Sequence, residues 1–135
     1  MRDTVTARAL VLTEPLSLWG GVEPTSGRVV DPHHPQRGAA LAGRVVVMPA
    51  GRGSSSSASV LAELARGGVA PAAIVVGEAD LVLPIGAVVA EELYGVRIPV
   101  VVRPPGELAR IVDGALVRVG PGDRVAPATA TDGTD

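Results

Sequence analysis

The stretch GRGSSSS, Gly51 to Ser57, combines residue types that bind anions and activate hydroxyl groups. Its two glycines let the backbone approach a ligand closely, and Arg52 offers a forked cation suited to carboxylate or phosphate. An apolar strand precedes the stretch and helical spacing follows it, so free helix amides should converge there. The pattern predicts an anion site, although a polar turn with one serine as N-cap explains it about equally well.

This stretch differs from two better-known motifs for phosphate binding and nucleophilic catalysis. A Walker A loop requires a lysine after its glycines, and none follows here. A nucleophile elbow has the pattern G-x-S-x-G, which is also absent.

A second polar group lies in DPHHP, which contains Asp31, His33 and His34. A histidine beside an aspartate can act as an acid, a base or a metal ligand. Two histidines without further spaced ligands are a weak metal signal, so a turn with local backbone bonds is favoured. Trp19, in PLSLWGG, is expected to pack its loop rather than line a cleft.

Composition restricts the class of protein. The 12 basic residues are all arginine and are scattered, which argues against a nucleic-acid partner. The chain has no cysteine, so it can form no disulfide and supply no cysteine ligand to a metal. Its apolar runs are shorter than the roughly 18 residues of a membrane span, and its polar start is unlike a signal peptide. We expect a cytoplasmic protein with no membrane partner.

The elements that must position these residues follow from apolar periodicity. Buried strands are predicted at 43–49, 72–76 and 98–102. The first helix is marked by Val60, Leu61, Leu64 and Ala65 and ends at Gly67–Gly68, and a second spans 83–95. The inward residues predicted for the second helix are Ile85, Val88, Val89 and Leu93. This alternation predicts an α/β fold with a parallel βαβαβ core.

Both ends of the chain add β structure to this core. A strand at 6–12 and two short pieces around the Gly-Pro-Gly turn in 115–125 predict an additional β layer. Residues 13–38 form a long segment, with a short strand expected at 27–31, and long ordered segments are often functional. We expect one domain, residues 1–126, followed by a flexible tail, residues 127–135.

Four uncommon strings make the chain resemble a known family. EPLSLWGG, DPHHP, GRGSSSS and AEELYG all lie between Ala9 and Val102. In these the chain resembles the small, swivelling-domain subunit of the aconitase X group, which includes phosphomevalonate dehydratases and cis-3-hydroxy-L-proline dehydratases. The sequence from Arg103 onward is matched less closely.

This resemblance implies a swivelling β/β/α fold and the loss of water from a hydroxy acid. It implies an iron or iron–sulfur centre in a large partner subunit, with no cofactor or metal bound by this chain. The catalytic base would be Ser54, with Ser55 as the next candidate, in a cleft shared with that subunit. The substrate-binding residues expected from it are Gly51, Arg52, Gly53, Ser56, Ser17, Trp19, Gly20, Gly21, Asp31, His33 and His34.

Three hypotheses about function remain open at this stage. The chain is a hydro-lyase subunit, an anion-binding module or a structural partner without catalytic groups. For the hydro-lyase, a small hydroxy acid such as cis-3-hydroxy-L-proline is favoured over mevalonate 5-phosphate, because the sequence shows one anion cradle. We also expect an exposed apolar patch around residues 15–38, where the partner would bind.

Overall fold

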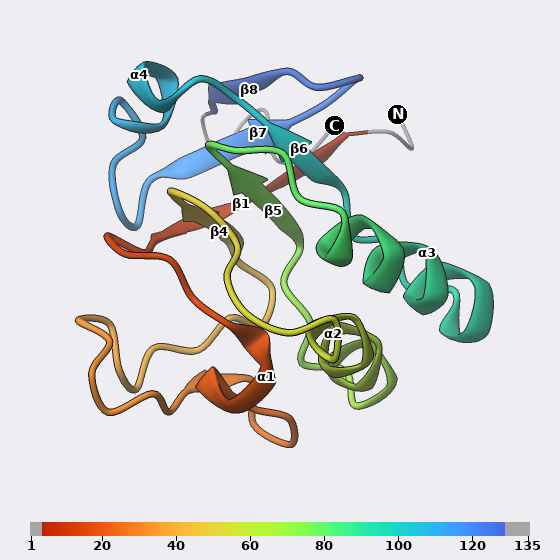
Figure 1. Ribbon diagram of the computed structural model, residues 1–135. Helices are drawn as coiled ribbons and strands as arrows, with labels where there is room; N and C mark the ends of the chain where they lie inside the picture. Colours follow the sequence, from red (N-terminus) through yellow and green to blue (C-terminus); the bar gives the residue numbers. More distant parts are fainter. Residues whose placement is uncertain (1–3, 129–135) are drawn as a thin grey trace.

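The computed structural model describes residues 4–128, in which a curled six-stranded sheet has the two longest helices on one side (Figure 1). Six strands are hydrogen-bonded in the order β6-β5-β4-β1-β7-β8. Their bounds are β1 Val5–Val11, β4 Val45–Met48, β5 Ala73–Val76, β6 Val100–Val102, β7 Leu116–Val119 and β8 Val125–Pro127.

The parallel part of the sheet is built by β4, α2 (Ser57–Arg66), β5, α3 (Val82–Tyr94) and β6. The strands are short runs of valine and isoleucine, which suit strands buried on both faces. Gly68 and Gly95, both at positive φ, follow the two helices. The predicted strand–helix–strand–helix–strand core is confirmed.

The sheet curls, so the two faces of its central strands face two different cores. Leu10, Val46 and Ile74 point toward the helices, while their neighbours Val45 and Val47 face the other way. That second core is closed by residues of β7 and of the segment before it, including Val117, Val119 and Leu108. The additional β layer is thus present, but it continues the same sheet through the antiparallel β1–β7 pair.

The long segment 13–38 is ordered and packs on the helical side. It contains a short helix, α1 (Leu18–Gly21), and a two-stranded ribbon of β2 (Val22–Glu23) and β3 (Arg28–Val29). The strand expected at 27–31 is therefore shorter, and α1 and β2 were not predicted. Leu16 forms a parallel bridge with Gly51, which holds this segment against the serine-rich turn.

The inward face predicted for α3 is wrong. Ile85, Val88 and Leu93 are 57%, 60% and 66% exposed, and Val89 is only partly buried. The buried residues of the helix are Leu83, Gly86 and Ala90. The helix is apolar around most of its circumference, so hydrophobic spacing alone did not identify the face that packs on α2.

The C-terminal part contains a further short helix, α4 (Pro105–Leu108), before β7. β8 includes Pro127, and the amide of Ala128 donates to the carbonyl of Leu116, 3.0 Å away. The ordered part thus reaches past the predicted domain end at residue 126, and residues 129–135 of the expected tail lie outside the described residues. No helix within 4–128 is long and apolar enough to cross a membrane.

Candidate functional site

Three loops meet at the carboxyl ends of the parallel strands, where ligands commonly bind in α/β sheets. They follow β1, β4 and β5 and lead into α1, α2 and α3 (Figure 1). Between them lies a half-open pocket of about 120 Å³. The pocket is lined by Leu16, Leu18, Gly51, Arg52, Gly53, Ser54, Ser57, Asp80, Val82 and Leu83.

Ser54 is the predicted residue whose surroundings favour chemistry most. It is half-buried, and its Oγ accepts a hydrogen bond from the Ser56 amide at 3.0 Å. An N–H donor aimed at a hydroxyl oxygen stabilises that oxygen when it loses its proton. Ser55 is exposed and lies outside the pocket lining.

The start of α2 differs from the open anion cradle expected from the sequence. The Ser57 amide donates to the Ser54 carbonyl, and the Ala58 amide donates to the Ser55 carbonyl. With the Ser56 amide on Ser54 Oγ, three amides of this turn already have partners within it. Exposed Arg52, which lines the pocket, is therefore the main cation available to an anionic ligand.

Ser57 is a pocket residue that the sequence reasoning missed. It is 4% exposed, and its Oγ accepts a hydrogen bond from the Trp19 amide at 3.2 Å. This bond ties α1 to the first residue of α2. The only signal in the sequence for Ser57 as a pocket residue was its position as the last of four serines. A serine at the start of a helix usually caps the helix, so this signal did not indicate a role in the pocket.

Asp80 is a second pocket residue that was missed. Its Oδ1 accepts hydrogen bonds from the amides of Val82 and Leu83, both at 2.8 Å, and so caps α3. Its Oδ2 lies over Gly51, where any Cβ would overlap it. Only glycine at position 51 therefore lets the Asp80 carboxylate approach the backbone so closely. In the sequence, an aspartate two residues before an apolar helix could have indicated that Asp80 caps this helix.

The EPLSLWGG segment borders the pocket through its leucines. Gly53, at φ +98°, leaves no room for a Cβ because Ser17 Oγ occupies that space. Ser17 Oγ donates to the Trp19 carbonyl at 2.9 Å, while the Trp19 side chain is 59% exposed. Gly20 is exposed and Gly21 is buried against Leu16, so these glycines shape the loop without lining the pocket.

The DPHHP segment is held by local bonds and does not reach the pocket. Asp31 Oδ1 accepts from the His33 amide at 2.9 Å, and the His33 side chain is exposed. His34 is 5% exposed; its Nδ1 accepts from the Gln36 amide, which leaves Nε2–H to donate to the Glu14 carbonyl. Residues 4–128 contain no cluster of three metal-ligating side chains.

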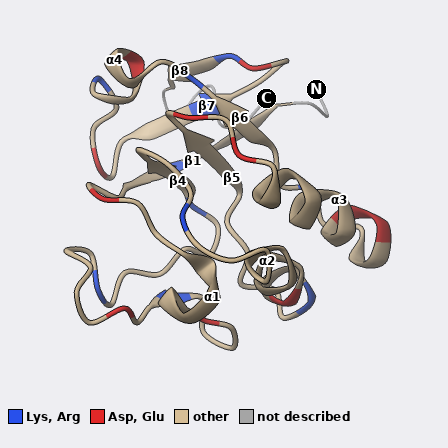
Figure 2. Ribbon diagram, viewed as in Figure 1, with Lys and Arg blue, Asp and Glu red and all other residues tan. Residues whose placement is uncertain are grey.

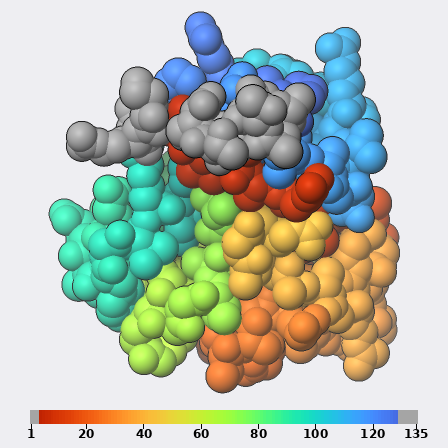
Figure 3. Space-filling model, turned by 180° about the vertical axis from the view of Figure 1, so that it is seen from behind, coloured from red at the N-terminus to blue at the C-terminus, as the bar shows by residue number. Residues whose placement is uncertain are grey.

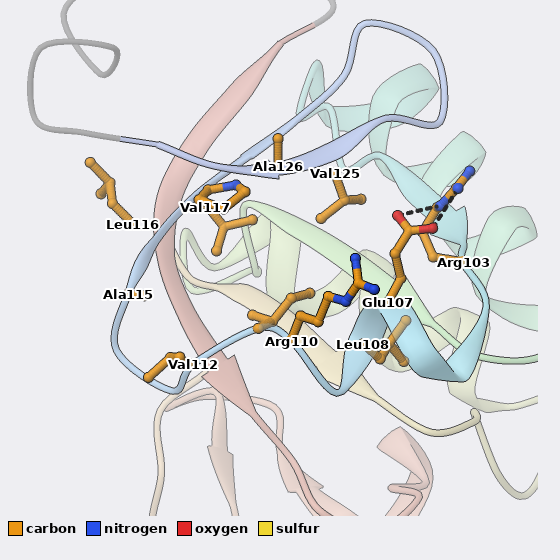
Figure 4. A pocket seen from close by; sticks show the side chains of 12 residues that line it. Arg103, Glu107, Leu108, Arg110, Val112, Ala115, Leu116, Val117, Val125 and Ala126 are labelled. Atoms are coloured by element: carbon orange, nitrogen blue, oxygen red, sulfur yellow. Dashed lines mark hydrogen bonds and ion pairs between the residues drawn. The ribbon is translucent and has the colours of Figure 1, made fainter.

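A larger hollow of about 510 Å³ lies elsewhere, between α4 and the β7–β8 hairpin (Figure 4). Its walls are mostly apolar, and Arg103 forms an ion pair with Glu107 at 2.6 Å on one side. Arg103 donates hydrogen bonds that lower the pKa of Glu107. None of the candidate residues lines this hollow, so its size does not make it the functional site.

Comparison with known proteins gives consistent matches. The model of a family described as the aconitase X swivel domain matches residues 1–126. Cis-3-hydroxy-L-proline dehydratase of Pseudomonas aeruginosa is 54% identical over 85 residues, which cover 63% of this chain and 15% of that protein. Phosphomevalonate dehydratase small subunit of Methanopyrus kandleri is 42% identical over 93% of this chain and 89% of its own length.

A solved structure agrees with these sequence matches. A chain of Thermococcus kodakaraensis aconitase X in its holo-form superimposes with a TM-score of 0.79 at 30% identity. The match covers 93% of this chain and 91% of that chain. The chain thus spans nearly the whole of two relatives but only a small part of the long Pseudomonas protein.

Proposed function

The chain belongs to the aconitase X swivel-domain family, and from this premise we propose that it is the small subunit of a heteromeric hydro-lyase. The enzyme would remove water from a small hydroxy acid such as cis-3-hydroxy-L-proline. The dehydratase names of the relatives support the reaction, and the name small subunit supports a larger partner.

The observation that carries this proposal is the hydrogen bond from the Ser56 amide to Ser54 Oγ within the pocket. A serine hydroxyl is a poor base unless its anion is stabilised, and this amide is fixed to do so. Ser54 as an alkoxide would take the proton from the carbon beside the substrate carboxylate. The hydroxyl group on the next carbon then departs as hydroxide, and the proton taken up by Ser54 passes to it, so that water is the second product and the Ser54 alkoxide is restored.

The other predicted residues take supporting roles in this proposal. Arg52 would pair with the substrate carboxylate, while Gly51 and Gly53 would shape the site by letting Asp80 and Ser17 pack closely against the turn. Ser56 would act through its amide rather than its hydroxyl. The remaining residues would shape the mouth of the site or hold the long loop in place; they are Ser17, Trp19, Gly20, Gly21, Asp31, His33 and His34.

A partner is needed to complete the site. The pocket of about 120 Å³ is small beside the roughly 300–1,000 Å³ of ordinary ligand sites, and it is only partly enclosed. We propose that an aconitase X-type large subunit supplies the missing wall and carries an iron or iron–sulfur centre. That centre would act as a Lewis acid for the departing hydroxyl group.

Mevalonate 5-phosphate is a second candidate substrate. The specific observation in its favour is length, since the Methanopyrus small subunit matches this chain almost end to end. The two substrates differ in charge: cis-3-hydroxy-L-proline carries one carboxylate and an ammonium group, whereas mevalonate 5-phosphate carries a carboxylate and a phosphate. Arg52 is the only arginine or lysine among the pocket-lining residues, which favours cis-3-hydroxy-L-proline, the substrate with one negatively charged group.

The test is dehydratase activity of this chain co-expressed with the large subunit, on both substrates. Ser54→Ala is expected to lower kcat by about 100-fold or more with KM little changed, as for loss of a general base. Ser55→Ala, a matched change in the same turn, is expected to retain activity. Circular dichroism of both variants establishes that they fold.

Other results would redirect the proposal. Loss of activity in Ser55→Ala alone would assign the base to Ser55. Full activity in both variants would make this chain a structural partner. A wild-type pair inactive on both substrates, together with anion binding by the isolated chain, would favour a binding module.

A further inference from the structure

α3 is apolar on faces that residues 4–128 leave exposed. From Val82 to Ala90 the helix has no charged or hydrogen-bonding side chain. A helix that is apolar all round is normally buried all round. Here only the face with Leu83, Gly86 and Ala90 is buried, and it packs against α2.

The opposite face of α3 carries a continuous apolar row. Leu81, Ile85 and Val88 follow at helical spacing and are 83%, 57% and 60% exposed. We call these three residues the α3 stripe. In Figure 2 the helix has no charged residue until its C-terminal end, and in Figure 3 it forms one side of the molecule, beside α2.

The α3 stripe begins at the rim of the candidate site. Leu81 stands between Asp80 and Val82, which both line the pocket. Another loop of the site brings Trp19, 59% exposed, directly after the pocket residue Leu18. Exposed apolar side chains therefore lie beside two of the three loops that form the pocket. On the loop of Leu81, this apolar surface continues along α3.

We propose that the α3 stripe, together with Trp19, is the docking surface for the large subunit. This inference rests on the proposed function, because it identifies where the partner that completes the pocket binds. A chain that closes the pocket must cover its rim, and from Leu81 the apolar surface continues without a charge to Val88. Apolar surface of this kind, next to an incomplete polar site, fits a stable subunit interface.

The occupant is the large subunit rather than a second copy of this chain. A second copy would bring only another small pocket of the same kind. It would not supply the groups needed for departure of the substrate hydroxyl, which the proposed function assigns to the partner. The large subunit brings the missing wall. Trp19 and the α3 stripe would then be buried by the same chain that faces Ser54.

The test measures affinity between this chain and the large subunit, with a matched control. Val88→Glu places a charge in the stripe on an exposed helical position, where glutamate is a good helix former. We expect the dissociation constant to rise by about tenfold or more. Val112→Glu makes the same change at a valine that is 67% exposed and lines the other hollow, and is expected to leave affinity unchanged.

The possible outcomes separate this inference from the function on which it rests. If the wild-type chain does not bind the large subunit, the proposed function fails. If it binds and neither Val88→Glu nor a second variant, Ile85→Glu, weakens binding, only the docking surface is wrong. Weakening by Val112→Glu alone would move the interface to the β7–β8 side. Light scattering that shows self-association lost in Val88→Glu, with unchanged affinity for the large subunit, would also overturn the docking surface.

Discussion

At the scale of single residues, the pocket depends on residues that contact two neighbours at once. Ser54 supplies its carbonyl to the Ser57 amide and its hydroxyl to the Ser56 amide. Asp80 caps α3 with one oxygen and covers Gly51 with the other. Such double use fixes the positions of the polar atoms that face the ligand space.

Asp80 can be tested separately from the proposed base. Asp80→Ala removes the acceptor for the Val82 and Leu83 amides and is expected to cost about 1 kcal/mol of unfolding free energy. Asp80→Asn keeps an oxygen acceptor of the same size and should recover most of that loss. Urea denaturation of the two variants measures the difference, and equal loss in both would mean that capping is not the role of Asp80.

At the scale of elements, the site depends on how closely α2 and α3 approach each other. A Cβ on Gly86 would lie 2.9 Å from the Ala58 carbonyl oxygen and 3.1 Å from Leu61 Cβ. The two helices thus meet backbone to backbone near the start of α2. This contact sets the distance between the serine-rich turn, which leads into α2, and Asp80, which lies just before α3.

Gly86→Ala tests that contact. Alanine favours a helix by about 1 kcal/mol over glycine, but the added methyl group must push the helices apart, so we expect a net loss of about 1–2 kcal/mol. Gly106→Ala in α4 is the control, because a Cβ there meets nothing within 4 Å. It should be neutral or stabilising by up to about 1 kcal/mol. Thermal unfolding measures the stability of both variants. A Gly86→Ala variant more stable than the wild type would contradict close packing of α2 against α3.

At the scale of the whole molecule, one sheet serves two cores because it curls. The helical core borders the pocket, while the second core lies on the other face of the sheet, with β7 and Leu108. Val119 is fully buried in the second core. Stability of the fold and geometry of the pocket can therefore be changed separately.

Val119→Ala is expected to lower the free energy of unfolding by about 2 kcal/mol, from lost burial and the cavity that remains. Dehydratase activity of the folded protein with its partner should be unchanged, because Val119 is far in the fold from the serine-rich turn. Val112→Ala, at an exposed valine, should change neither quantity. Denaturant unfolding and activity are measured in parallel, and a loss of activity in folded Val119→Ala would show that the two cores are coupled.

The sequence by itself determined the parallel core, the turn that carries Ser54 and the family. Runs such as 43–49 and 72–76 are β-branched and bounded by glycine or proline, so the local chain already prefers strands there. Four uncommon strings, one of which contains Ser54, identified the aconitase X family. Each of these runs and strings is encoded locally, within a few consecutive residues.

Tertiary structure alone decided which faces are buried and which residues share the pocket. Hydrophobic spacing fits several faces of α3 equally well, and the small Gly86 facing Ala58 selected the one that packs. Asp80 joins Ser54 only because β4 and β5 are neighbours in the sheet and their following loops meet. His34 is a residue type that can bind a ligand or metal, but both of its ring nitrogens form hydrogen bonds with backbone groups of its own loop. Each of these outcomes depends on contacts between segments far apart in the chain, which no local pattern records.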